Sequence, residues 1–414
     1  MAAFSGCRNQ DANQNYFILY FIQRRSKILT DRQTDRQTDR QTVKESFKAI
    51  VYHGAIKCKD CFGMLKRAIY RFRVRYNLYH KVDLPPYDEQ SLEEQYHYVD
   101  PCCVSAEYFY QHKKATVDVS IVVPLYNSIR YAKRIVKMFN NQKTDYTFEI
   151  LLINDGSKDD TYAVMKALIA DKPNFVLYNK TNGGIADARN YGIEQCRGKC
   201  IGFFDHDDIV TNDYIQKLYN LAIKRNADIV LCQHGTITTD GIITRKGQSG
   251  GFIWGGIYRR DIFEHMRFPK NYWYEDMING FLIKPQANKI LEVKETLYYK
   301  ETSAHNASKI LWHNDEIKAI DQWYLTKSLV HSYYNLGLKD EELVFKLALN
   351  ECSTLMVSRI GGIDPALQMQ VFMACSRFLQ SLYQKRFHLS SSQKRFYMAL
   401  KSQDFSLWKL LAKC

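Results

Sequence analysis

Two carboxylates stand two residues apart where Asp205 and Asp207 follow an apolar run at 200–204. Carboxylate oxygens at this spacing can hold one hard divalent cation, which keeps several waters and bridges to substrate phosphates. Such a cation neutralises charge on a departing diphosphate. A solvated acidic turn has the same spacing, and Asp208 beside it is typical of a helix cap. The pattern therefore predicts either a Mn²⁺ or Mg²⁺ site or an ordinary acidic turn.

A second acidic pair, Glu275 and Asp276, comes about seventy residues later, after an aromatic run at 272–274. A group transfer to a hydroxyl needs a base that accepts the hydroxyl proton, and a carboxylate can serve. Adjacent acids are also common in the first turn of a helix, where they complement the helix dipole. Both interpretations remain open for this pair.

The elements that would position these residues alternate along the chain from residue 117. Apolar runs predict strands at 118–124, 148–153, 175–178, 200–204 and 228–232, and amphipathic spacing predicts helices at 128–141, 159–170, 184–196 and 212–225. This alternation indicates an α/β fold with a mostly parallel sheet and helices on both faces. Functional groups then belong at the carboxyl ends of the strands.

Polar residues do gather at those strand ends. The candidates are Pro124 and Tyr126, Asp155, Asn182, Arg189, and Asp205 with Asp207. Asp155 precedes Gly156 and is equally typical of an Asx-turn. Arg189 is either a substrate contact or a counter-ion to the acids.

The segments at 120–127, 153–161, 182–193 and 201–208 resemble, in this order, the motifs of family 2 glycosyltransferases. The resemblance covers about 117–305 and implies an inverting enzyme of the GT-A fold. It implies that Asp155 accepts the N3 hydrogen of uracil and that the backbone near Pro124 and Tyr126 lines the base pocket. Asn182 and Arg189 correspond to family positions near the nucleotide and the acidic motif.

The same resemblance assigns the two acidic motifs. Asp205 and Asp207 are the expected metal ligands, and Asp276 is the expected base, with Glu275 orienting or capping. His305 is a candidate late ligand to metal or phosphate, although a surface histidine fits as well. Trp254 lies where an acceptor-side segment is expected, either as a sugar platform or as a core residue.

The regions outside this domain differ in composition. We expect a disordered, low-complexity leader at 1–43 containing a repeated Asp-Arg-Gln-Thr unit, a basic helical extension at 44–116, the transferase domain at 117–305, and a helical basic region at 306–414. The net charge is +14, and the excess of Lys and Arg concentrates at 44–81 and 375–414. Solvated helix faces would explain such charge, but aromatic residues interleaved at 405–411 are typical of a helix in a membrane interface. We therefore expect an anionic membrane surface, not nucleic acid, as partner.

Composition excludes several classes. Apolar residues make up 46% and charged residues 25% of the chain, which argues against wholesale disorder, collagen and coiled coil. No apolar run approaches the length of a membrane span. The eleven cysteines are odd in number and scattered, which favours a reducing compartment, and a zinc site at Cys58, Cys61, Cys102 and Cys103 fits known spacings poorly. These features predict a cytoplasmic bacterial protein peripheral to the inner face of the cytoplasmic membrane.

The leading hypothesis is a metal-dependent transferase that moves a sugar from a nucleotide diphosphate, UDP-linked, onto a lipid-linked surface glycan such as lipopolysaccharide or lipooligosaccharide. A processive synthase would add membrane spans and a Gln-x-x-Arg-Trp motif, and a nucleotidyltransferase would carry a Gly-rich loop after the first strand. A non-catalytic glycan- or nucleic-acid-binding relative would be expected to lack Asp205, Asp207 or Asp276. The repeat at 30–42 is compatible with a GACA tract, and slippage there would switch expression by phase variation.

Overall fold

The computed structural model describes residues 88–105, 114–238, 241, 243–248, 251–302 and 317–411. The repeat at 30–42, the basic stretch at 44–81 and the candidate ligand His305 lie outside these residues, as do Cys58 and Cys61 of the zinc alternative. The first described element is helix α4, Glu89–Tyr96, whose N-terminus is capped by Asp88.

One half of the sheet is parallel. Strand β1 (Val117–Leu125) lies between β2 (Phe148–Asp155) and β4 (Gly198–Phe203), and β3 (Phe175–Lys180) pairs with the outer side of β2. All three pairings are parallel. Residues 119–125 are all buried because both faces of this central strand are covered, as expected for a parallel sheet with helices on both sides. These strands end at one edge and carry the predicted polar loops to it.

The other half of the sheet is mixed. It contains β5 (Ile209–Val210), β6 (Ile229–Thr238), β7 (Ile243–Gln248), β8 (Gly256–Arg259) and β9 (Ile290–Thr302). The strand order is β3-β2-β1-β4-β8-β6-β9-β5, and β7 pairs with β6. The β4–β8 pairing is antiparallel, whereas β6 and β9 run parallel. This arrangement sets β9 beside the loop that follows β4.

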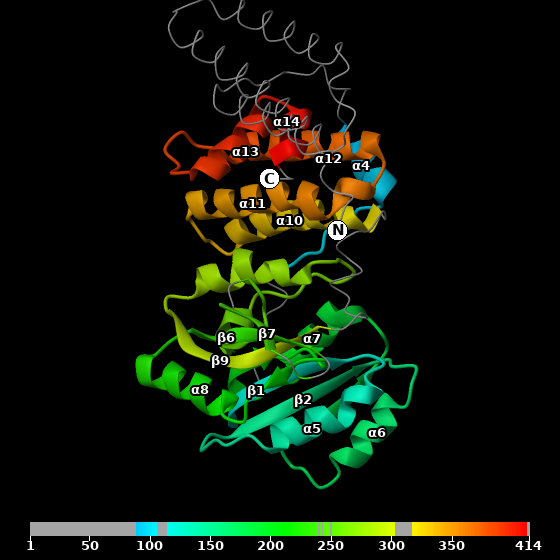
Figure 1. The fold of residues 1–414 in the computed structure, drawn as a ribbon, viewed down its shortest axis with the longest axis vertical. Coiled ribbons are helices and arrows are strands. Elements are labelled where there is room, and N and C mark those ends of the chain that lie inside the picture. The colour runs from blue at the N-terminus through cyan, green and yellow to red at the C-terminus, as the bar shows by residue number, and fades with distance from the viewer. Residues whose placement is uncertain are drawn as a thin grey trace, which may run out of the picture. The chain divides into compact units, whose positions relative to one another are not determined.

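Helices cover both faces of the sheet (Figure 1). The face formed by Ile121 and Val123 packs against α5 (Ala132–Asn140), α6 (Thr161–Leu168) and α8 (Tyr214–Arg225). The opposite face packs against α7 (Gly184–Gln195), where a Cβ at Gly192 would come within 2.3 Å of Val122 Cγ1. The predicted α/β fold with helices on both faces is therefore confirmed.

Three predicted helices begin later than expected, because α5 begins at Ala132, α6 at Thr161 and α8 at Tyr214. A 3₁₀ turn, Ile129–Tyr131, precedes α5. Asp159 precedes α6, and its carboxylate accepts a hydrogen bond from the backbone N–H of Thr161 at 3.1 Å.

The C-terminal region is helical, as predicted. It contains α10 (Asp321–Asn335), α11 (Glu341–Ser358), α12 (Pro365–Leu382), α13 (Ser391–Lys401) and α14 (Phe405–Leu411). Leu407 and Trp408 of α14 are fully buried, and the Trp408 ring packs 5.0 Å from Phe372 of α12. The membrane-interface interpretation of 405–411 is therefore wrong, because its apolar side chains form helix–helix contacts. Within the described residues, no helix combines the length and apolarity needed to cross a membrane.

Candidate active site

The acidic loop after β4 is anchored to β9 by its third aspartate. The buried Asp208 carboxylate accepts hydrogen bonds from the Tyr298 hydroxyl at 2.5 Å and from the Glu301 backbone N–H at 2.9 Å. Burial, together with Asp205 and Asp207, raises the pKa of Asp208 well above its usual range. Our interpretation of Asp208 as a helix cap is wrong. It instead fixes the loop that carries the other two acids.

Asp205 and Asp207 form a donor set of oxygen atoms with an unfavourable mutual charge. Burial and the neighbouring Asp205 raise the pKa of Asp207, which shows that negative charge is poorly compensated there. A divalent cation would supply that compensation, so the residues fit a hard metal ion. No group of three or more metal-binding side chains converges anywhere in the described part of the chain.

Arg189 on α7 connects this loop with the second acidic pair. Its guanidinium donates to Asp205 Oδ1 at 3.0 Å and to Glu275 Oε1 at 2.6 Å. The side chain is only 3% exposed and lies over the Phe268 ring. Arg189 thus acts as a counter-ion to the acids, which is one of its two predicted roles. Through it the two acidic motifs lie next to each other, although about seventy residues separate them in the sequence.

Asp276 lies in a 3₁₀ turn, Glu275–Met277, which leads into a π-helical turn, Asn279–Ile283. Burial raises the pKa of Asp276 to about 7, Glu275 beside it adds to the rise, and Arg189 limits it. A carboxylate with such a pKa accepts protons efficiently near neutral pH. Glu275 and Asp276 also stand in the first turn of this helical segment, so the helix N-terminus interpretation describes their position.

The backbone that presents Asp276 adopts a rare conformation. Tyr274, two residues earlier, has a φ of 65°, which side chains with a Cβ seldom adopt. The ring of Tyr274 is buried and lies 4.3 Å below the guanidinium carbon of Arg359. Such a conformation persists only where surrounding contacts enforce it.

Those contacts come from the C-terminal helices, which our sequence reasoning did not connect with the site. The backbone N–H of Trp273 donates to Asp321 Oδ2 at 2.5 Å, and burial raises the pKa of Asp321 to about 7. Arg359 Nε donates to Gln322 Oε1 at 3.2 Å, and Gln322 in turn donates to Glu351 Oε2 at 2.7 Å. No motif marks these residues, and their burial within amphipathic helices is invisible without the packing.

At the end of β2, Asp155 closes the N-terminus of α7. Its carboxylate accepts from the backbone N–H groups of Gly183 at 2.9 Å and Gly184 at 2.8 Å, and from Lys180 Nζ at 2.6 Å. Asn182 donates to the Asp155 carbonyl at 2.8 Å. The predicted candidates Asp155 and Asn182 therefore lie together at the N-terminus of α7. The Asp155 carboxylate is the anion that accepts hydrogen bonds from the backbone N–H groups there.

The loops after β1 and β2 are joined to each other. The Asn127 side chain accepts from the Lys158 backbone N–H at 2.8 Å, and the Asn127 backbone N–H donates to Ser157 Oγ at 3.0 Å. Pro124 is buried within β1, whereas the Tyr126 side chain is 40% exposed. Tyr126 thus presents a ring at the sheet edge near Asp155, and Pro124 contributes backbone.

Trp254 is a core residue, because it is 3% exposed and stacks on Tyr298 with a centroid distance of 4.7 Å. The platform interpretation of Trp254 is therefore wrong.

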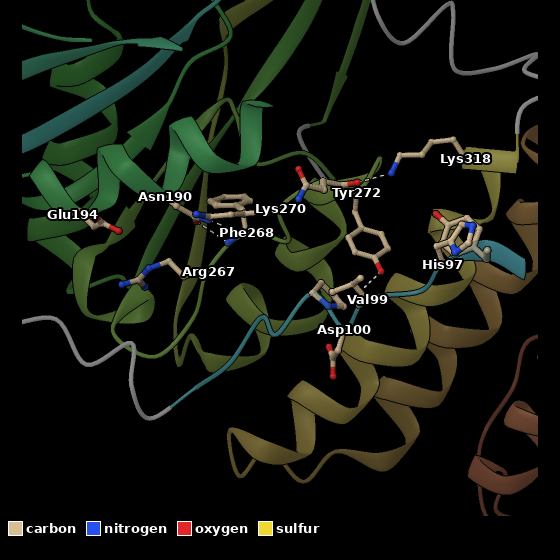
Figure 2. A pocket seen from close by; sticks show the side chains of 13 residues that line it. His97, Val99, Asp100, Asn190, Glu194, Arg267, Phe268, Lys270, Tyr272 and Lys318 are labelled. Atoms are coloured by element: carbon tan, nitrogen blue, oxygen red, sulfur yellow. Dashed lines mark hydrogen bonds between the residues drawn. The ribbon is translucent and has the colours of Figure 1, made fainter. Parts of the chain in front are cut away.

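A separate cavity of about 600 Å³ lies between 96–101, α7 and the loop at 267–272 (Figure 2). Lys270 at this cavity forms an ion pair with Asp187, which also pairs with Lys180 at 2.6 Å. Lys180 contacts Asp155, so the cavity wall is linked to the β2 loop through paired charges. The cavity contains none of the predicted site residues.

Comparisons with known proteins agree with this geometry. Residues 120–281 match the family described as glycosyl transferase family 2. The uncharacterized glycosyltransferase YibD of Escherichia coli K12 is 24% identical over 328 residues, which is 71% of this chain and 94% of YibD. Residues 120–281 therefore form a domain of glycosyl transferase family 2, and the chain is a glycosyltransferase, as predicted.

Two solved structures are also similar. One is Staphylococcus aureus TarS 1–349 in complex with UDP-GlcNAc, with a TM-score of 0.44 and 15% identity over 69% of this chain and 90% of TarS 1–349. The other is the mannosyltransferase PcManGT from Pyrobaculum calidifontis in complex with GDP-Man and Mn²⁺, with a TM-score of 0.41 and 14% identity over 85% and 93% of the two chains.

Proposed function

We propose that this glycosyltransferase transfers a sugar from a UDP-sugar, with inversion, onto a lipid-linked surface glycan such as lipopolysaccharide or lipooligosaccharide. A divalent cation at Asp205 and Asp207 and the base Asp276 would carry the reaction. The observation that supports this most strongly is the buried Arg189 guanidinium, which contacts both Asp205 and Glu275. It joins the acid pair suited to a diphosphate-bound cation with the segment that carries the base.

In this mechanism, Asp276 takes the proton of the acceptor hydroxyl while the hydroxyl oxygen attacks the anomeric carbon. The bond from that carbon to the diphosphate oxygen breaks on the opposite face, which inverts the configuration. Asp276 is suited to this because burial and Glu275 raise its pKa to about 7. When bound, Mn²⁺ or Mg²⁺ supplies positive charge that offsets the charge developing on the diphosphate. Arg189 keeps Asp205 and Glu275 from repelling each other.

The donor assignment to UDP rests on Asp155 and its resemblance to the family position that accepts the uracil N3 hydrogen. Each carboxylate oxygen has two lone pairs, so Asp155 can accept a further hydrogen bond while it holds α7. Tyr126 would line the base pocket with the backbone of Pro124, and Asn182 would border the nucleotide.

A panel of nucleotide sugars tests both the donor and the metal. Release of nucleoside diphosphate is measured without acceptor for UDP- and GDP-linked sugars, in Mn²⁺, in Mg²⁺ and in EDTA. We expect release from a UDP-sugar that EDTA abolishes. Release only from GDP-sugars contradicts the UDP assignment, and full release in EDTA contradicts the metal.

The membrane partner is proposed on charge alone. Lys385, Arg386, Lys394 and Lys401 are exposed in the C-terminal region, where they can attract anionic lipid headgroups. The full chain is expected to sediment with anionic vesicles at low salt and to be released as salt rises. Equal sedimentation with neutral vesicles contradicts this electrostatic partner.

Phase variation is proposed at the level of DNA. A four-base unit shifts the reading frame with each gain or loss, so an unbroken GACA tract encoding 30–42 would switch expression on and off. Mixed synonymous codons in the repeat would contradict the proposal.

A further inference from the structure

Three aromatic rings form a column beside the candidate active site. Phe252 stacks on Trp254 with a centroid distance of 4.4 Å and an interplanar angle of 9°, and Trp254 stacks on Tyr298 at 4.7 Å and 14°. Trp254 and Tyr298 are buried, whereas Phe252 is 38% exposed. The column thus ends in the accessible ring of Phe252, which packs on the two buried rings of Trp254 and Tyr298.

Each end of the column is tied to one of the two acidic motifs. At the buried end, the Tyr298 hydroxyl donates to Asp208 at 2.5 Å and accepts from the Asp205 backbone N–H at 3.4 Å. At the exposed end, the Phe252 carbonyl accepts from Asn279 Nδ2 at 2.6 Å. Asn279 is fully buried and lies three residues after Asp276. The column and the Phe252 backbone therefore connect the metal motif with the segment that follows Asp276.

The surroundings of the ring leave room for a ligand. A Cβ built on Gly251 would meet no heavy atom of the described residues within 4 Å. Lys300 Nζ lies 5.9 Å from the centroid of Phe252 and 5.6 Å from that of Trp254, so a cation lies beside the column. An exposed aromatic face next to polar groups is suited to a sugar, whose C–H face is apolar and whose rim is made of hydroxyls.

From this geometry we infer that Phe252 is the platform on which the apolar face of the acceptor's sugar ring stacks. The inference rests on the transfer proposed above, in which the attacking hydroxyl must lie between the metal motif and Asp276. Phe252 is tied to both, and the buried rings beneath it fix its orientation before the acceptor arrives. Preorganisation of this kind limits the entropy lost on binding.

Saturation-transfer NMR on the full chain with UDP and Mn²⁺ tests the platform. The probes are the methyl pyranosides of glucose, galactose, mannose and N-acetylglucosamine. We expect at least one to receive saturation at its ring C–H protons, and Phe252→Ala to reduce that signal by about tenfold. Phe252→Trp, which keeps an aromatic face, should restore it. Tyr334→Ala, which removes another exposed ring of similar accessibility on α10, should leave it unchanged.

Two results would overturn the inference. One is the absence of saturation of every pyranoside in the wild type, and the other is equal saturation in wild type and Phe252→Ala. Release of UDP without acceptor, measured on the same samples, separates this test from that of the function. Phe252→Ala should bind UDP in Mn²⁺ with the wild-type Kd, so a parallel loss of UDP binding would assign the ring to the donor side and also contradict the platform. A wild type that releases no nucleotide contradicts the proposed function itself, whatever Phe252 does.

Discussion

The proposed donor side and the proposed base side of this site are built in different ways. On the donor side, Asp155, Asn182 and Asp205 follow consecutive strands of one parallel half-sheet, and their loops are held within the sheet domain, to each other and to β9. On the base side, Asp276 lies in a 3₁₀ turn with no strand before it. Its segment is held by Asp321 and Arg359 of the C-terminal helical region.

This difference indicates that the two sides depend on different parts of the fold for their positions. The donor loops inherit their positions from strand register, although they include a left-handed Asn127 and the buried Asp208, whose pKa is raised. The base segment requires a left-handed Tyr274 and a half-buried carboxylate whose pKa is raised to about 7. The backbone conformation and the raised pKa are both unfavourable, and the packing of α10 and α11 must offset their cost. Arg189 bonds directly to both sides.

The largest effect should come from the metal motif on the donor side. Asp207→Asn removes one metal-ligating charge while keeping the shape, so we expect turnover to fall at least ~10³-fold and Mn²⁺-dependent binding of the donor to disappear. The thermal midpoint should not fall, because the change also relieves repulsion with Asp205. Steady-state kinetics and calorimetric titration measure both, with the exposed Asp171→Asn as matched control. Wild-type turnover of Asp207→Asn would contradict the metal assignment.

A change at Arg189 should weaken both sides together. Arg189→Lys keeps the charge but cannot bond both carboxylates in the same fork geometry, so we expect a ~10²-fold loss in kcat/KM with weaker donor binding. Arg189→Leu should also lower the free energy of unfolding by about 3–5 kcal/mol, because it leaves buried acids unpaired. Kinetics of the lysine variant and denaturant unfolding of both variants measure these effects. If Arg189→Lys lowered turnover while donor affinity stayed intact, the residue would serve the base side alone.

The base side should set the pH dependence of turnover. Asp276 faces Glu275, Arg189, Asp205 and Glu351, and its raised pKa means that the active carboxylate form is lost as pH falls through about 7. We expect turnover to rise about tenfold from pH 6 to pH 8, with the midpoint moved lower where a bound cation adds positive charge. Donor affinity should change less over this range. A turnover that stays constant from pH 5 to pH 8 would contradict the raised pKa.

A smaller effect should follow from loosening the helices behind the base. Arg359→Ala removes the cation over Tyr274, and we expect a five- to tenfold decrease in kcat with an unchanged KM for the donor. Arg359→Lys should recover part of the loss, since it returns a cation to the ring. The exposed Arg386→Ala serves as control in the same helical region. Equal decreases in both alanine variants would indicate general destabilisation of the helices instead of positioning.

The grouping of Asp155 and Asp205 at one edge of the sheet could be predicted from the sequence, because alternating strands and helices place them there whatever the details of packing. The proximity of Asp276 to that edge followed only from family resemblance. The roles of Asp321 and Arg359 could not be predicted, since a helix-borne Asp or Arg gives no local signal of what it contacts. The sequence left Trp254 open between platform and core for a related reason. An aromatic residue in a loop is equally able to face solvent or core, and its stacking partner Tyr298 is on a strand far along the chain.

The most direct test of the account is to measure turnover and donor affinity together in Asp276→Asn. The asparagine keeps the shape of the side chain but cannot accept a proton at neutral pH. We expect turnover to fall ~10²–10⁴-fold while the donor Kd in Mn²⁺, measured by calorimetry, stays within about twofold of wild type. The variant should also lose the rise of turnover with pH. Wild-type turnover, or a donor affinity that collapses in parallel with turnover, would contradict a separate base side with Asp276 at its centre.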